Sequence, residues 1–361
     1  MVIMGGNNEN VSAGYELTGV EKTRKRAALI IVIGILALVI LFAVSFTVGP
    51  FSIGLVESFE EIWNIIVTFG NPDDMSGKII LNIRIPRTIA VMLVGAGLAI
   101  AGAVMQAMIH NPLVDPYITG VSSGASFGVI LFTLGGSMTG WAFSYMLAPV
   151  GAIIGAVVAF AITMIVAEAA GGKAMSYVLG GVIVAAGLSA GTTLIMSLNA
   201  DKIHSITSWM FGSFANIEWN NVIVIAIPII LILIIILFEA RKLNVMLLGE
   251  SQAQYLGLDS RKYKRMMLML AAVLTAFCVA YCGVIGFIGL IVPHLCRMVV
   301  GGDHRLLIPS SIIVGAVVLL VADIVCKSGP IGELPIGALT SVIGVPFFIF
   351  LMVKEGKRYA M

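Results

Sequence analysis

The chain has 361 residues, of which 59% are hydrophobic and only 11% are charged, and its mean hydropathy is +1.07. So little polar surface cannot cover a water-soluble globule of this length, which excludes an ordinary soluble protein. The formal net charge of +2 is too small to suggest a nucleic-acid partner. We therefore expect a protein embedded in a lipid bilayer.

The N-terminal region combines a basic cluster, Lys22 to Arg26, with an apolar stretch from about 27 to 48. A secretory signal has a similar pattern, but this stretch is near the roughly 20 residues of a membrane span and no small-x-small cleavage site ends it. We interpret it as the first permanent membrane helix.

Nine further apolar runs come after it, which gives ten predicted transmembrane helices and an all-α polytopic membrane protein. The eighth run is short and rich in glycine, so the seventh and eighth are the least regular and are expected to form a broken or tilted pair. These nine runs lie at about 86–108, 118–135, 146–168, 176–198, 221–239, 266–284, 286–300, 307–326 and 335–353.

Basic residues are concentrated on one side of this ten-span arrangement. Cytoplasmic loops retain an excess of Lys and Arg, and an even number of spans returns the chain to its starting side. We therefore expect a multi-pass protein of the cell membrane with both termini in the cytoplasm: a tail at 1–26, a transmembrane domain at 27–353 and a tail at 354–361. The opposite side holds only Lys78, Arg84, Arg87, Lys202 and Lys327.

Glycines recur at helical spacing in several of the predicted spans. Gly120, Gly124 and Gly128 are separated by four residues, as are Gly151 and Gly155, and Gly187 and Gly191. Small residues at this spacing let two membrane helices approach closely, although glycine is also simply common in membrane helices. The pattern favours a tightly packed bundle.

Nucleotide, metal and catalytic motifs are not found in the sequence. Gly171-Gly172-Lys173 lacks the upstream glycine of a phosphate-binding loop and is followed by Ala174. The four histidines and four cysteines show neither HExxH nor paired CxxC spacing. We therefore expect no catalytic residues, no metal site and no nucleotide bound by this chain.

Several segments occur in an order and spacing that identify a family. They are Arg84-Ile-Pro-Arg87, Asn111-Pro-Leu-Val-Asp-Pro116, Leu248-Gly-Glu250 with Leu256-Gly257, Gly286 to His294, Asp303-His-Arg305 and Glu333-Leu-Pro-Ile-Gly337. Over about residues 27–353 the chain resembles the FecCD-type permeases of ABC importers, which take up iron-siderophores, vitamin B12, haem and some oxyanions.

The resemblance implies a bundle like that of the vitamin B12 importer permease, working as a homodimer. It also implies two cytoplasmic ABC ATPase subunits, which bind the ATP and Mg²⁺, and an extracytoplasmic substrate-binding protein. An iron(III)-siderophore is the leading cargo, with a corrinoid or haem next, moved by alternating access. We expect the lipid bilayer as the surroundings and no nucleic-acid partner.

The resemblance also assigns three sets of residues. The ATPase-coupling set lies in the loop at about 240–264, where a short helix would end at a left-handed glycine and Asp259 or Ser260 would cap the next helix: Gly249, Glu250, Ala253, Leu256 and Gly257. The binding-protein docking set is Arg84, Arg87 and Lys327. The translocation-path set, on the fifth and tenth spans, is Gly187, Ser189, Gly191, Thr192, Gly337, Thr340, Ser341 and Gly344.

Two other classes of protein stay open on the sequence alone. A secondary, ion-coupled transporter would need intramembrane carboxylates or broken helices at an ion site. Asp323 lies deep in the ninth run, and we expect it to be paired or near a helix end, because an unpaired carboxylate in the bilayer is costly. A membrane enzyme would need a convergent catalytic set, which the sequence does not show.

Overall fold

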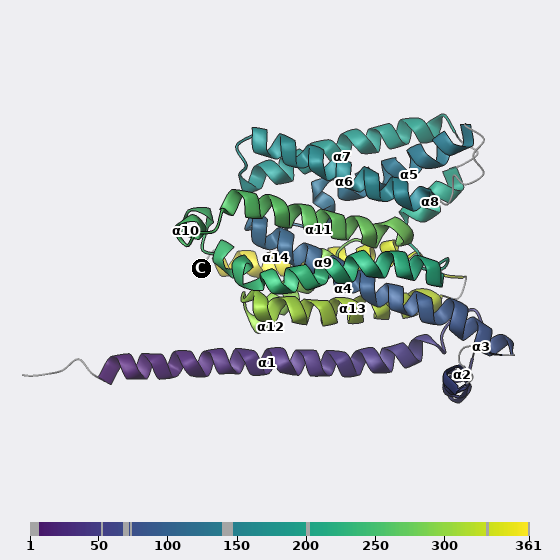
Figure 1. The fold of residues 1–361 in the computed structure, drawn as a ribbon, viewed down its shortest axis with the longest axis horizontal. Coiled ribbons are helices and arrows are strands. Elements are labelled where there is room, and N and C mark those ends of the chain that lie inside the picture. The colour runs from purple at the N-terminus through teal and green to yellow at the C-terminus, as the bar shows by residue number, and fades with distance from the viewer. Residues whose placement is uncertain are drawn as a thin grey trace, which may run out of the picture.

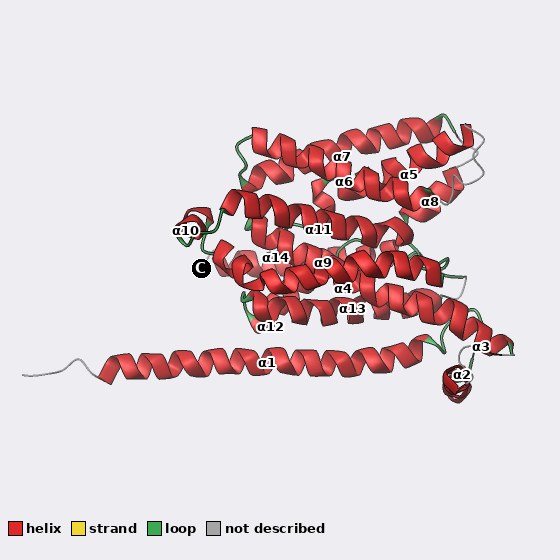
Figure 2. Ribbon diagram, in the orientation of Figure 1, coloured by secondary structure: helices red, strands yellow, loops and turns green. Residues whose placement is uncertain are grey.

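The computed structural model describes residues 7–51, 53–67, 72, 74–138, 147–199, 203–329 and 332–359. The elements assigned in these residues are all helices, most of them lying side by side in one bundle (Figures 1 and 2). Seven are long and apolar enough to cross a membrane: α1 (Asn7–Ser45), α4 (Ile85–Ile109), α6 (Ala148–Ala169), α7 (Ala174–Ser197), α9 (Trp219–Met246), α11 (Ser260–Cys282) and α13 (His304–Lys327).

Three further helices carry shorter apolar stretches: α5 (Val121–Met138), α12 (Ile288–Val300) and α14 (Ile336–Tyr359). Together with the seven longer helices they correspond in order to the ten predicted apolar runs. The predicted all-α polytopic membrane fold is therefore confirmed.

Short helices connect or extend the long ones. The sequence predicted only α10 (Glu250–Tyr255). The others are α2 (Leu55–Val67), α3 (Met75–Ile79), the π-helix η1 (Ile80–Arg84), the 3-10 helix η2 (Pro116–Thr119) and α8 (Ile203–Met210).

The two ends of the bundle are distinct. α10 lies at one end together with the C-terminus, and α2 and α3 lie at the other (Figure 1). We call these the α10 end and the α2 end. α1 has 39 residues, about 58 Å at 1.5 Å per residue, and its first turns project beyond the α10 end (Figure 1). Both described chain ends therefore lie at the α10 end.

Small residues determine how the central helices meet. α4 is the most buried of the long helices, and it packs against α9, α11, α12 and α13. α5 and α6 meet through the predicted glycines: a Cβ on Gly128 would collide with the carbonyl of Gly151, and one on Gly124 with the carbonyl of Gly155. The expected close packing is confirmed for these two helices, whereas a Cβ on Gly187 of α7 would meet nothing within 4 Å in this chain.

The predicted cytoplasmic tails are partly helical, and their position outside the membrane stays a prediction. Helix α1 already begins at Asn7, inside the predicted tail at 1–26, and α14 continues to Tyr359 through most of the predicted tail at 354–361. The remaining tail residues, 1–6 and 360–361, lie outside the described residues, as does Lys202.

The seventh and eighth runs form a pair broken between its two helices, because α11 itself is regular over 23 residues. The irregularity lies after it, where Gly283 and Phe287 have φ of +71° and +70°. A Cβ on Gly283 would strike the carbonyl of Trp209, so only glycine fits this crossing. Of the two helices, α12 is the short one, with 13 residues.

Candidate functional site

The segment between α9 and α11 forms a short helix bracketed by two glycines, as the capping pattern predicted. Gly249 precedes α10 with φ +103°, and Gly257 follows it with φ +84°. A side chain with a Cβ is strained at such angles, so both glycines are required by the backbone. Asp259 then caps α11 by accepting from the backbone N–H of Lys262. α10 is thus a separate element held on two sharp turns.

α10 divides its side chains between the bundle and the space beyond it. Ala253 is completely buried. Tyr255 and Leu256 are 92% and 64% exposed, at a helix that already lies at the end of the bundle (Figure 1). An exposed aromatic and an exposed leucine at this place form a contact surface suited to an apolar partner. Tyr255 was not among the residues predicted from the sequence; its signal is an aromatic residue in an otherwise polar loop.

Lys264 ties α10 to the rest of the bundle. Its Nζ donates to Glu250 Oε1 at 2.8 Å and to the carbonyl of Gly172 at 3.2 Å, and lies 5.0 Å from the centre of the Tyr177 ring. Lys264 is buried, whereas Glu250 is half exposed. Through this one ammonium group, α10 contacts α11, the turn between α6 and α7, and the first turn of α7.

The surroundings of Lys264 are polar and include a second ion pair. Arg265 forms a two-pronged ion pair with Glu168 at the end of α6. A cavity of about 200 Å³ lies among these groups, lined by Glu168, Gly171, Gly172, Tyr177, Glu250, Arg261, Lys264 and Arg265. Lys264 and Arg265 thus connect α11 with α10, with the end of α6 and with the turn that leads into α7.

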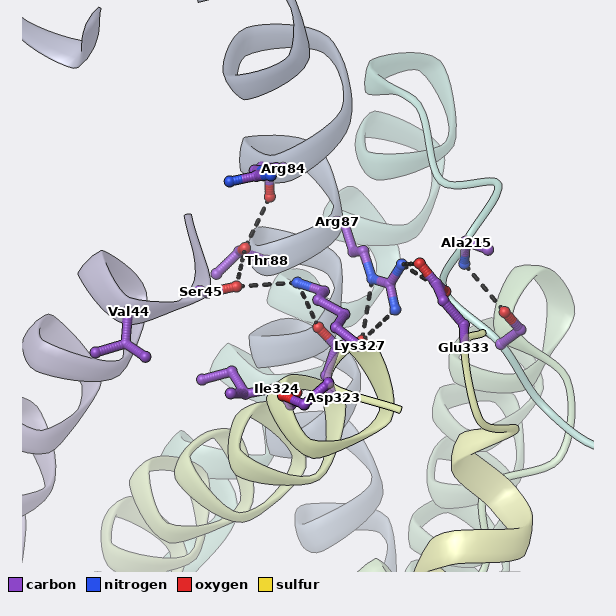
Figure 3. A network of polar contacts seen from close by, with 12 residues as sticks. Val44, Ser45, Arg84, Arg87, Thr88, Ala215, Asp323, Ile324, Lys327 and Glu333 are labelled. Atoms are coloured by element: carbon purple, nitrogen blue, oxygen red, sulfur yellow. Dashed lines mark hydrogen bonds and ion pairs between the residues drawn. The ribbon is translucent and has the colours of Figure 1, made fainter. Parts of the chain in front are cut away.

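A buried ion network occupies the α2 end of the bundle (Figure 3). Arg87 on α4 donates to Asp323 Oδ1 from Nε at 3.0 Å and Nη2 at 2.9 Å. Its Nη1 lies 2.8 Å from both carboxylate oxygens of Glu333. Lys327 lies 2.7 Å from Asp323 Oδ2 and donates to Ser45 Oγ at 3.0 Å.

This network contains two cations and two anions: Arg87, Lys327 and Asp323 are buried, and Glu333 lies at its exposed edge. It joins α1, α4, α13 and the segment that leads into α14. The expectation that Asp323 is paired is confirmed. Removing one member would leave an uncompensated buried charge, which costs far more than the net value of the pair. The network therefore fixes how these helices meet at the α2 end.

The three residues predicted for docking all lie at the α2 end, and all three are buried. Arg87 and Lys327 already have carboxylate partners within the chain. Arg84 differs, because it donates from Nη2 to the carbonyl of Phe51, and its Nη1 has no hydrogen-bond partner among the described residues. The docking role stays a prediction, and Arg84 is the member of the set with an unused donor.

The eight residues predicted to line a path do not form one surface within a single chain. Gly187 and Ser189 lie on the exposed face of α7, Gly191 packs against Phe127, and Thr192 is buried. On α14, Ser341 is half-buried, and Gly337, Thr340 and Gly344 face the interior. A Cβ on Gly344 would meet the ring of Phe287. The exposed residues of α14 are instead large and apolar, and include Val342, Ile343 and Ile349.

Comparison with known proteins agrees with this geometry. Residues 35–354 match the FecCD transport family. The hemin transport system permease protein HmuU of Yersinia pestis is 35% identical over 332 residues, covering 90% of this chain and 95% of that protein. The iron(3+)-hydroxamate import system permease protein FhuG of Bacillus subtilis is 34% identical over 342 residues, covering 92% and 99%.

A solved structure shares the fold. It is described as an inward-facing conformation of a transporter of the metal-chelate ABC type; it is 32% identical, has a TM-score of 0.77, and the match covers 91% of this chain and 99% of that one. A bundle of ten apolar helices with these relatives defines the membrane-spanning permease subunit of an ABC importer. The chain belongs to the FecCD transport family.

Proposed function

We propose that this chain is the cell-membrane permease of a binding-protein-dependent importer for an iron chelate, with its α10 end in the cytoplasm. The distribution of charge supports this orientation. The α10 end carries the basic residues before the first span and those around α10, whereas the cations of the α2 end are few and mostly paired. Cytoplasmic loops retain an excess of Lys and Arg.

The observation that carries the proposal is the position of α10. This helix stands on two glycine turns at the end of the bundle, exposes Tyr255 and Leu256, and is held by Lys264. A small exposed helix of this kind suits a groove on a partner, where helix-in-groove docking provides affinity. The partner in this proposal is a cytoplasmic ATPase that binds ATP and Mg²⁺, two copies of which drive the permease.

Transmission would follow the contacts of Lys264. When the ATPases close, α10 moves with them, and Lys264 passes that displacement to the turn between α6 and α7. The first turn of α7 then shifts, and α7 carries Gly187 and Ser189 on its exposed face. Close-packed helices and ion pairs transmit such a displacement, because packed interfaces switch between discrete arrangements rather than deforming gradually.

A second copy of the chain would complete the path. α7 is largely unburied within one chain, with only 17% of its apolar window inside the protein. The exposed faces of α7 and α14 are therefore the surfaces that we assign to the homodimer and its central path, rather than the buried Gly337, Thr340 and Gly344. A wall of small and apolar residues holds no cargo tightly, so a bulky chelate would pass without a strong binding site.

The α2 end would receive the extracytoplasmic binding protein. Arg84 is our first candidate for docking because it forms no ion pair with a carboxylate of the described residues; its unused Nη1 is buried, so docking would have to expose the guanidinium. An acidic side chain from the binding protein would pair with it and fix the register of the complex. Arg87 and Lys327 would act by holding the surface on which docking takes place.

The cargo is assigned by class only. The relatives named for hemin and for iron(3+)-hydroxamate are 35% and 34% identical and a relative named for cobalamin is 37% identical, so sequence identity does not rank these cargoes. An iron(III)-siderophore is our first assignment, with haem or a corrinoid after it. The specificity would rest with the binding protein.

Uptake into vesicles tests the proposal. The chain, its ATPase and its binding protein would be reconstituted into proteoliposomes and supplied with a radioactive iron(III)-hydroxamate. We expect uptake that requires ATP and the binding protein and that is unaffected by collapsing ion gradients. Uptake driven by an ion gradient without ATP would show a secondary transporter instead.

A further inference from the structure

Helix α2 has three chemically different faces. Ser58, Ile62 and Ile65 form the face toward the protein, where the two isoleucines pack with Ile80 of η1. Glu57, Glu60, Glu61 and Asn64 form an adjacent polar face. The third face is apolar and exposed: Val56 (72%), Phe59 (55%), Trp63 (67%) and Val67 (57%).

The spacing of this third face is regular. Its members are three, four and four residues apart, so they share one stripe of a helix that turns every 3.6 residues. Phe51 before α2 and Met75 after it are also strongly exposed. Exposed apolar residues therefore run along the whole length of α2 and form one surface.

The orientation of α2 relative to the membrane helices indicates which environment surrounds its exposed apolar face. In Figure 1 the membrane helices run across the view, whereas α2 is seen end-on at the tip of α1 and α3. Its axis therefore lies across the bundle axis, in the plane that the membrane surface would occupy. α1, whose apolar window is only 6% buried, ends at Ser45, so the lipid-facing surface of α1 leads directly to α2.

We propose that the face formed by Val56, Phe59, Trp63 and Val67 lies in the boundary between headgroups and acyl chains of the leaflet at the α2 end. Trp and Phe favour this depth. The polar face then meets water and the isoleucine face meets the protein, so each of the three faces has a matching environment. The occupant is lipid rather than a protein, because the face continues the lipid-exposed surface of α1.

Contact of α2 with the membrane surface would also affect α4. α2 packs on η1, which continues without interruption into α4 and carries Arg84. A helix fixed at the membrane surface thus sets the height of the α2 end of α4 relative to the bilayer. This inference rests on the membrane fold alone and does not depend on the proposed cargo or ATPase.

Spin labelling in lipid tests the placement. The full chain would carry Phe59→Cys, or Glu60→Cys as a matched control one residue away on the polar side, each with a nitroxide label in phosphatidylcholine nanodiscs. The four native cysteines are buried and do not compete for the label. Accessibility to oxygen, which concentrates in lipid, is compared with accessibility to a water-soluble nickel chelate.

We expect the label at 59 to be several-fold more accessible to oxygen than to the nickel chelate, and the label at 60 to show the opposite preference. Val56→Cys provides a second test position should Phe59→Cys fold poorly. Equal access of the nickel chelate at 59 and 60 would place the face in water. Loss of access to both reagents at 59 would place it against protein. Either result overturns the inference.

Discussion

Lys264 lies with its Nζ 2.8 Å from Glu250 Oε1, and the same ammonium group donates to the carbonyl of Gly172. Glu250 belongs to α10, Lys264 to α11, and Gly172 to the turn that begins α7. One buried cation therefore connects the exposed helix at the end of the bundle with a helix of the proposed path.

Replacing Lys264 by Met should uncouple transport from ATP hydrolysis. The methionine keeps the apolar stem but loses both hydrogen bonds, so we expect ATP-driven uptake to fall about tenfold or more, which corresponds to roughly 1.4 kcal/mol of lost coupling. ATP hydrolysis by the assembled complex should continue. Lys262→Met, on the exposed side of the same helix, is the control and should transport normally. Equal uptake by the Lys264 and Lys262 variants would contradict the transmission route.

Breaking the ion network at the α2 end should destabilise the chain. Asp323→Asn leaves Arg87 and Lys327 with less negative charge at a buried site, and such losses cost about 3 to 5 kcal/mol. The free energy of unfolding would be measured by titration with sodium dodecyl sulfate in mixed micelles. Lys242→Met, which breaks an exposed pair with Glu239, should cost less than about 1 kcal/mol. A small loss for Asp323→Asn would show that the network is not structural.

The glycine contact of α5 and α6 makes a position-specific prediction. Gly128→Ala places a methyl group against the carbonyl of Gly151 and should cost about 1 to 3 kcal/mol by forcing the two helices apart. Gly135→Ala on the same helix meets nothing within 4 Å and should be neutral. Thermal unfolding in detergent separates the two variants. Similar melting temperatures would mean that the close approach does not contribute.

Acid stability should depend on Asp303. The hydrogen bond from Arg305 is the main cause that lowers the pKa of the Asp303 carboxyl from 3.8 to about 2. A lowered pKa means that this contribution is fully present above about pH 4 and is lost as the pH falls toward 2. Asp303→Asn should make the free energy of unfolding less dependent on pH between about pH 4 and pH 2. The slope of the free energy against pH near pH 7 should stay the same. An unchanged acid transition in the variant would contradict this assignment.

Docking of the binding protein should require the positive charge of Arg84, whereas Arg87 should be required for the permease to fold. Arg84→Glu should weaken binding of the binding protein, most strongly at low salt; because Arg84 is buried, binding is compared at equal amounts of folded permease. Arg87→Glu should reduce the amount of folded permease, because it opposes Asp323 and Glu333. Binding by surface plasmon resonance and the yield of monodisperse protein distinguish the two. Normal binding by Arg84→Glu would remove Arg84 from the docking site.

Local sequence patterns predicted the fold well. Apolar run length identified the ten helices, glycine spacing predicted close helix packing of the kind seen between α5 and α6, and the capping pattern identified α10 between Gly249 and Gly257. These features depend on residues that are neighbours in the chain. The short α2 was not predicted, because its apolar face alternates with acidic residues and gives no continuous run.

Contacts between distant residues could not be predicted in the same way. Arg87 and Asp323 are 236 residues apart and Lys264 and Gly172 are 92 apart. The sequence required a partner for Asp323 but could not identify it. It also placed Gly337 and Gly344 on a path by resemblance, whereas in one chain they pack against the turn before α12 and against Phe287.

The most direct test of the account asks what Tyr255 touches. A photocrosslinking amino acid in place of Tyr255 would be irradiated in the assembled transporter in nanodiscs, with the same group at Lys78, at the opposite end, as the control. We predict a crosslink from position 255 to the ATPase whose yield changes when ATP binds, and none from position 78. A crosslink to the binding protein, or none to the ATPase, would contradict the claim that energy reaches this chain through α10.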